Sequence, residues 1–147
     1  MRHPVYGEDE MARHIAARMA RKVIFDRTPA PSLGFVMEEV TLRRPLGGRD
    51  TLRRQLKHLH EAGQLRHVEI QVMPTDRGNH SGMGGPIQVL KLNDGSVVGY
   101  SETQLTSRFV SEPAELRTLE LRYGIIRAQA LRPGESLDFI GKVRGET

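Results

Sequence analysis

Residues 67–92 read HVEIQVMPTDRGNHSGMGGPIQVLKL, and this stretch predicts two strands joined by a glycine-rich loop. Apolar and polar residues alternate from His67 to Met73, which is typical of a strand with one buried face. Pro74 ends that strand, and the next is predicted over Ile87–Leu92. The loop between them contains four glycines and one histidine. Ordering so flexible a loop costs conformational entropy, so we expect a tight backbone path, a ligand or a partner to require it.

Helices are predicted on both sides of this stretch. Residues 8–27 form an apolar stripe at every fourth position, and residues 49–62 form a second helix that Gly63 ends in a left-handed conformation. Two further helices, separated by Pro133 and Gly134, occupy the last third of the chain. A short strand precedes Glu38, and the Asn-Asp-Gly sequence at 93–95 predicts a hairpin.

The sum of these elements is an α+β fold. We expect a small, mostly antiparallel sheet with helices packed on one side and a two-helix carboxy-terminal hairpin. The chain has 147 residues, no internal repeat and no low-complexity linker, which predicts one domain over residues 1–147.

Composition excludes several classes of protein. The absence of cysteine excludes disulfides, thiolate metal sites and cysteine nucleophiles. No apolar run is long enough to span a membrane, and the amino terminus lacks the apolar stretch of a signal peptide, so a soluble cytoplasmic protein is expected. The net charge is +4, but 22 basic and 18 acidic residues are interspersed. This favours a solvated, mixed-charge surface over a face that binds phosphates.

The glycine loop is the sharpest candidate site. Gly82, Gly84 and Gly85 could present backbone N–H groups to an anion, while His80 supplies a proton or a hydrogen bond. The alternative is a structural loop in which the glycines adopt positive φ angles and His80 caps the backbone. The order strand–loop–strand, with no following Lys-Ser or Lys-Thr, excludes nucleotide-binding motifs.

Charged and phenolic groups form two more candidates. Arg43 could clamp a carboxylate, or it could pair structurally with Glu38 or its neighbour Glu39. Tyr100 and Glu102 share one face of a strand and could orient a substrate near His80, or they could form a cross-strand polar pair.

No cofactor or metal is expected. The chain has six histidines, but His58 and His60 are two apart on a predicted helix and point in different directions. His67 begins a strand and alternates outward. None of these shows the spacing of metal ligands.

Six segments match a known family in order. Together they resemble the carboxy-terminal domain of unknown function, the 5753 family, of actinobacterial Xre-type helix-turn-helix, antitoxin-like regulators. The segments are TLRRPLGG (41–48), VEIQVMP (68–74), GNHSGMGGPI (78–87), YSE (100–102), SEPAEL (111–116) and ALRPGES (130–136). The resemblance implies an effector or partner-binding domain. The helix-turn-helix of the family is absent from this sequence, so direct sequence-specific binding of nucleic acid is not expected.

Two functional hypotheses follow. The first is a non-enzymatic effector domain that binds a small molecule or a small partner protein through Arg43, His80, Gly84, Gly85, Tyr100 and Glu102, with a possible homodimer formed by the final two helices. The second is a stand-alone, cofactor-independent enzyme of natural-product biosynthesis. It would perform a cyclisation or acid–base step with His80, Glu38 and Glu102.

Overall fold

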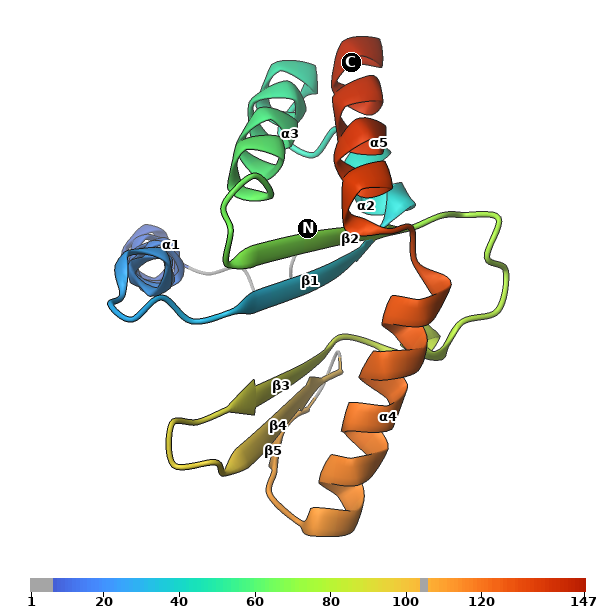
Figure 1. Cartoon of the computed structure of the whole chain (residues 1–147). Coiled ribbons are helices and arrows are strands. Elements are labelled where there is room, and N and C mark those ends of the chain that lie inside the picture. Colours follow the sequence, from blue (N-terminus) through green and yellow to red (C-terminus); the bar gives the residue numbers. More distant parts are fainter. Residues whose placement is uncertain (1–6, 104–105) are drawn as a thin grey trace. The chain divides into compact units, whose positions relative to one another are not determined.

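The computed structural model describes residues 7–103 and 106–147, and the contacts within it divide the chain into two compact units, Met1–Leu33 and Gly34–Thr147 (Figure 1). The first unit contains α1 (Glu8–Ala20), continued by the 3-10 helix η1 (Arg21–Asp26). This confirms the helix expected over residues 8–27. Acidic residues occupy the first turn of α1, where they stabilise the positive end of the helix dipole.

The apolar stripe of this first helix is exposed. Its four members are 44% to 59% exposed, and no residue of α1 or η1 is buried. They are Met11, Ile15, Met19 and Val23.

The strands of the chain form two sheets. β1 (Leu33–Glu38) pairs with β2 (Val68–Met73). The other sheet is antiparallel and has the order β3 (Ile87–Lys91), β4 (Val97–Glu102) and β5 (Ser107–Val110). The expected α+β class with a small antiparallel sheet is confirmed, but the strands are divided between two sheets, and β5 was not predicted.

Short helices and the predicted longer ones lie between these strands or follow the last of them. They are α2 (Glu39–Arg43), α3 (Arg49–Ala62), the 3-10 helix η2 (Ser81–Gly84), α4 (Pro113–Gln129) and α5 (Pro133–Glu146). α3 has the predicted bounds because Leu52 and Leu56 are buried along one face. The left-handed conformation predicted for Gly63 is wrong, since its φ is −70°. Its N–H instead donates to the carbonyl of Leu59 at 2.9 Å, a bond that any residue could make.

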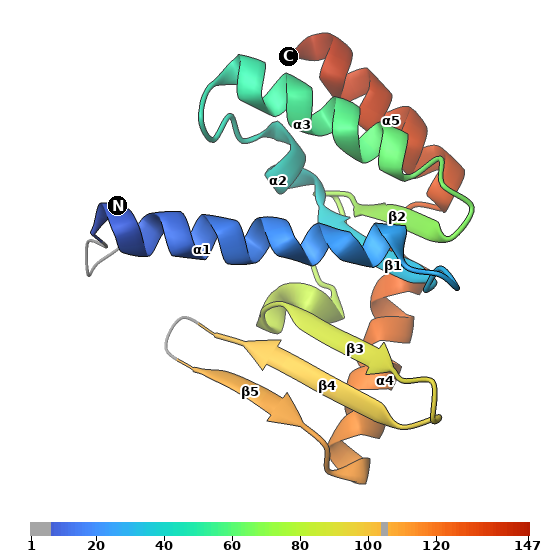
Figure 2. The ribbon, with the colours of Figure 1, turned by 90° about the vertical axis from the view of Figure 1, so that its left-hand side faces the viewer.

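The final two helices follow one another closely, as expected, but pack against different elements. α4 contacts η2, β2, β3 and β4, and Figure 2 shows it behind the three-stranded sheet. α5 contacts α3 and β2 (Figure 1). Buried side chains of α3, β2, α4 and α5 form most of the core.

A close approach between α4 and the three-stranded sheet depends on Gly99. A Cβ atom at this position would lie 2.5 Å from Leu119 of α4 and 3.1 Å from Val110 of β5. The side of β4 that Gly99 occupies therefore faces α4, and because side chains alternate along a strand, Tyr100 and Glu102 face the other way.

Within residues 7–103 and 106–147, no helix is both long and apolar enough to cross a membrane.

Candidate functional site

The junction between α4 and α5 is hydrogen-bonded to β2. The N–H of Leu131 donates to the carbonyl of Val72 at 2.9 Å, and the N–H of Val72 donates to Ser136 Oγ at 2.9 Å. Ser136 is fully buried, and its hydroxyl donates to the carbonyl of Leu131 at 3.3 Å. The junction therefore takes the place of a further strand beside β2, and this explains why α5 does not fold back along α4.

Gln71 is buried in the same junction, although strand alternation predicted it to be exposed. It is 6% exposed. Its Nε2 donates to the carbonyls of Leu131 at 2.8 Å and Arg127 at 3.2 Å, and its Oε1 accepts from Arg127 Nε at 3.0 Å. The side chains of β2 do alternate between its two faces, but the end of α4 covers the face on which Gln71 lies. Three hydrogen bonds compensate for the burial of the amide.

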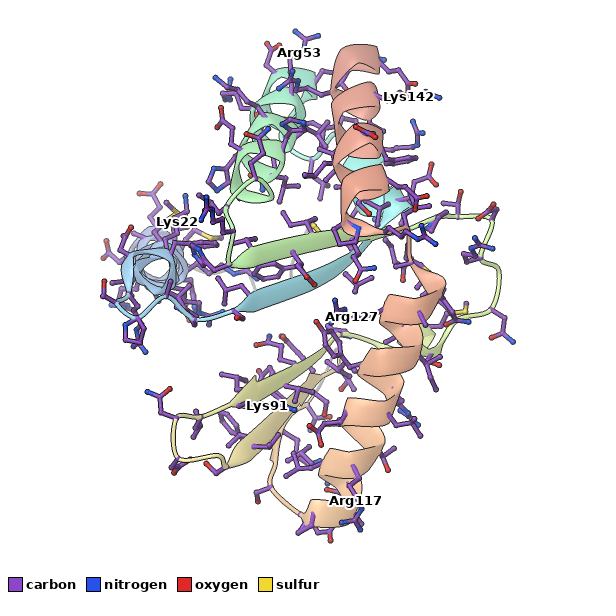
Figure 3. The ribbon with its side chains drawn as sticks, viewed as in Figure 1. Lys22, Arg53, Lys91, Arg117, Arg127 and Lys142 are labelled. Carbon is purple, nitrogen blue, oxygen red and sulfur yellow. The ribbon has the colours of Figure 1, made fainter. Side chains whose placement is uncertain are left out.

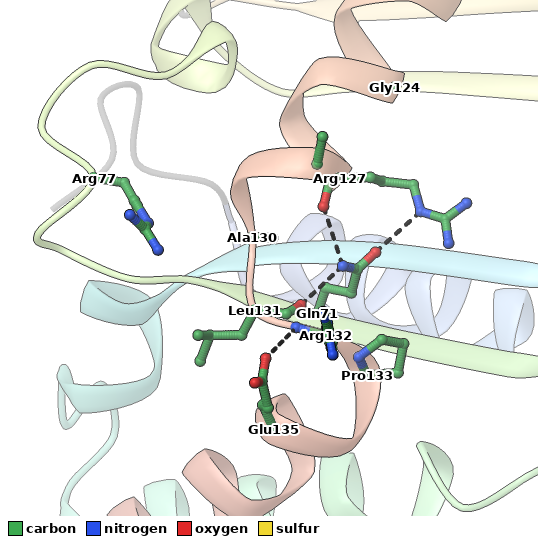
Figure 4. Close-up of a pocket in the computed structure, with 10 residues that line it drawn as sticks. Gln71, Arg77, Gly124, Arg127, Ala130, Leu131, Arg132, Pro133 and Glu135 are labelled. Carbon is green, nitrogen blue, oxygen red and sulfur yellow. Dashed lines mark hydrogen bonds between the residues drawn. The ribbon is translucent and has the colours of Figure 1, made fainter.

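An open hollow of about 600 Å³ lies at this junction (Figure 4). Its lining comes from β2, the loop after it, the end of α4 and the start of α5. The lining residues are Gln71, Arg77, Gly124, Arg127, Ala128, Ala130, Leu131, Arg132, Pro133 and Glu135.

Three arginines and one glutamate give the hollow its charge. Arg127 is held in place by Gln71 and by an ion pair with Glu69. Arg77 Nε lies 3.9 Å from Asp76 Oδ1, and no other acidic side chain of residues 7–103 and 106–147 pairs with it. Among the described residues, no acidic side chain pairs with Arg132, and Glu135 accepts from the backbone N–H of Arg132 at 2.9 Å. This leaves two guanidinium groups able to bind a carboxylate or a phosphate.

Sequence reasoning did not name this hollow. Gln71 and Arg132 are in the VEIQVMP and ALRPGES segments that carry the family resemblance, 61 residues apart in the chain. The occurrence of both residues in motif segments was the sequence signal that could have pointed to this hollow. Only the fold shows that the two segments meet.

Arg43, a predicted ligand residue, is engaged in a structural network. Its Nε donates to Glu39 Oε1 at 2.7 Å, its Nη1 donates to Glu146 Oε2 at 3.0 Å, and its guanidinium lies 5.4 Å from the ring centre of Phe139. The ion pair with a glutamate is therefore present, with Glu39 as partner, and Arg43 is 42% exposed. This arrangement ties α2 to α5.

Glu39 is the most constrained carboxylate of this network. It is 12% exposed, and its Oε2 accepts from the backbone N–H of Thr75 at 3.0 Å and from the Thr75 hydroxyl at 3.1 Å. The Thr75 N–H, followed by Arg43, holds the pKa of Glu39 below its ordinary value. The hydrogen bond to Glu39, followed by the one to Glu146, raises the pKa of Arg43.

In the glycine loop, His80 caps the backbone. Its Nδ1 accepts from the N–H of Gly82 at 3.2 Å at the start of η2, and its side chain is 8% exposed. Gly85 alone among the loop glycines has a positive φ, +114°. Gly84 has open space around it, and a Cβ atom on Gly85 would lie 3.3 Å from the carbonyl of Glu102.

The structure brings Glu38 to His80. The imidazole Nε2 lies 3.8 Å from Glu38 Oε1, and this carboxylate is half exposed. Because Nδ1 accepts from the backbone, the neutral imidazole carries its proton on Nε2, facing Glu38. Both ring nitrogens are thus already directed at protein groups.

Tyr100 and Glu102 are not joined to this pair. The ring of Tyr100 contacts Phe109 on β5, with centroids 5.3 Å apart. In the described part of the chain, no hydrogen bond or ion pair connects Tyr100 or Glu102 with His80. Hydrogen bonds and ion pairs therefore join neither Arg43 nor Tyr100 to His80: Glu38 and His80 meet, Arg43 belongs to another network, and Tyr100 lies on the face of the sheet that is turned away from α4.

Basic side chains are spread over the molecule. Figure 3 labels examples on η1, α3, β3, α4 and α5. Several are paired, such as Lys91 with Glu120 at 3.2 Å. Among the described residues, no three His, Asp or Glu side chains cluster in a way that could hold a metal ion.

Comparison with known proteins gives a family but no characterised relative. No curated protein and no solved structure matches the chain. A family model described as Domain of unknown function (DUF5753) matches residues 1–142, and the chain belongs to this family.

Proposed function

We propose that this chain is an effector domain that binds a small anionic ligand, bearing a carboxylate or a phosphate, in the hollow at the α4–α5 junction. The observation that supports it is the placement of Arg77 and Arg132 around one hollow, with Gln71 and Arg127 fixing its base. The volume of about 600 Å³ suits a metabolite-sized molecule. An acidic side chain of a small partner protein has the same chemistry and could occupy the same place.

The family resemblance supports the regulatory part of this proposal. The segments around Gln71 and Arg132 are among those that resemble the carboxy-terminal domains of actinobacterial Xre-type, antitoxin-like regulators. In such a regulator, a ligand at the α4–α5 junction would act on the element that links the three-stranded sheet to α5 and β2.

The test is native purification followed by mass spectrometry of the intact protein and of its extract. A co-purifying acidic metabolite, or a small polypeptide, is expected with the wild-type chain. Arg132→Ala should lose it, whereas Arg117→Ala near the start of α4, which removes the same charge outside this hollow, should retain it. Equal retention by both variants would contradict the proposed site.

A second proposal, a cofactor-independent acid–base enzyme of natural-product biosynthesis, is favoured by the His80–Glu38 pair. It is weakened by the bond from the Gly82 N–H to His80 Nδ1, since this nitrogen is then not free to accept a proton from a substrate. Incubation of the chain with a cellular metabolite extract tests it. Product formation that Glu38→Gln abolishes would support the enzyme, and unchanged metabolites would exclude it.

A further inference from the structure

Helix α1 has an apolar face that none of the described residues of its own unit, 7–33, buries. Met11, Ile15 and Met19 recur every four residues along α1, and all three are exposed. At 100° per residue they occupy one side of the helix, together with Ala12 and Ala16. The opposite side carries polar residues. An amphipathic helix with this pattern needs a partner for its apolar face.

The charges of the same segment are arranged by sign. The first turn of α1 contains Glu8, Asp9 and Glu10. Basic residues follow towards the other end, with Arg18 in the last turn of α1 and Arg21 and Lys22 in η1. Lys22 is labelled in Figure 3. A helix that is acidic at one end and basic at the other is complementary to an antiparallel copy of itself.

The apolar and charged positions agree on a single register. With Ile15 on the twofold axis, each Met11 lies opposite Met19 of the second copy, and each Glu8 lies opposite Lys22. The alanines between the apolar side chains allow the helices to approach closely. A parallel pair would instead place Glu8 beside Glu8, and like charges would oppose it.

We propose that α1 pairs with α1 of a second copy of this chain as an antiparallel, twofold-symmetric dimer centred on Ile15. This interface is independent of the ligand site and differs from the final two helices that the sequence suggested. A single helix face pairs in each copy, so the dimer is weak, and its affinity falls as salt screens the charge pairs.

The test is sedimentation equilibrium of the full chain over a wide concentration range, with circular dichroism to verify that each variant is folded. Ile15→Glu places two carboxylates across the twofold axis and should leave a monomer at every concentration. Ala17→Glu introduces the same charge on the opposite side of α1 and should dimerise like the wild type.

A charge reversal keeps the test decisive if Ile15→Glu is poorly folded. Glu8→Lys and Lys22→Glu should each weaken the dimer about tenfold, because two attractive pairs become repulsive, and the double variant should regain most of the wild-type affinity. A wild-type chain that stays monomeric overturns the proposal. So does a dimer that Ile15→Glu leaves intact, or a double variant no tighter than the single ones.

Discussion

Replacement of Gln71 by alanine tests how the α4–α5 junction is held to β2. The buried amide makes three hydrogen bonds, two to backbone carbonyls and one to Arg127. At about 1 kcal/mol net for each bond, the loss sums to about 3 kcal/mol. For a protein of this size, that loss lowers the melting temperature by roughly 6–12 °C.

The assay for Gln71→Ala is urea denaturation followed by circular dichroism, with Gln88→Ala as the matched control. Gln88 lies on β3 and is exposed, so its truncation should change the free energy of unfolding by less than about 0.5 kcal/mol. If Gln71→Ala were as mild as Gln88→Ala, the junction would not be held by this amide. The description of the base of the hollow would then be wrong.

Three further substitutions test other parts of the account. Gly99→Ala should destabilise the fold by about 1–3 kcal/mol because its Cβ would lie 2.5 Å from α4, whereas Gly134→Ala, which meets nothing within 4 Å, should be neutral or stabilising in thermal melts. Ser136→Ala leaves the buried N–H of β2 without its acceptor and should cost about 1–3 kcal/mol in urea, while the exposed Ser111→Ala should not. The folded-state pKa of Glu39 is lowered, so its contribution is present above its ordinary value of 4.5 and is lost as pH falls through the lowered pKa. Between pH 6 and pH 3 the wild type should therefore lose more unfolding free energy than Glu39→Gln, and equal losses would contradict the Thr75 network.

Local structure was predictable wherever the spacing of apolar residues indicated an element and a glycine or proline indicated where it ends. α3 has the predicted bounds, because its apolar residues recur with the helical period and a glycine follows. The hairpin was also predictable, since Gly95 has the positive φ of +83° that its turn requires, and Asp94 accepts from the N–H of Ser96.

Long-range pairing was not predictable in the same way. β5 has only four residues, three of them exposed, so it shows no periodic signal. Nothing within β1 or β2 indicates that the two strands pair in a sheet of their own. The junction of α4 and α5 covers the polar face of β2, and this contact reverses the predicted exposure of Gln71.

The candidate site was predicted residue by residue but not as an assembly. His80 and Glu38 were named as candidates for the same acid–base step without any prediction that they touch, and the fold brings them to 3.8 Å. Arg43 was named as a ligand residue, but its neighbour Glu39 engages it. The arginines of the hollow come from separate segments, and no spacing rule relates them before the chain is folded.

The most direct test of the proposed ligand site is a nuclear magnetic resonance titration that follows the arginine Nε–H signals as a fractionated acidic metabolite extract is added. The signals of Arg77 and Arg132 should shift and saturate, while that of Arg117 near the start of α4 should not. Saturable shifts confined to the region around His80 and Glu38, with those of the hollow unchanged, would contradict the proposed site.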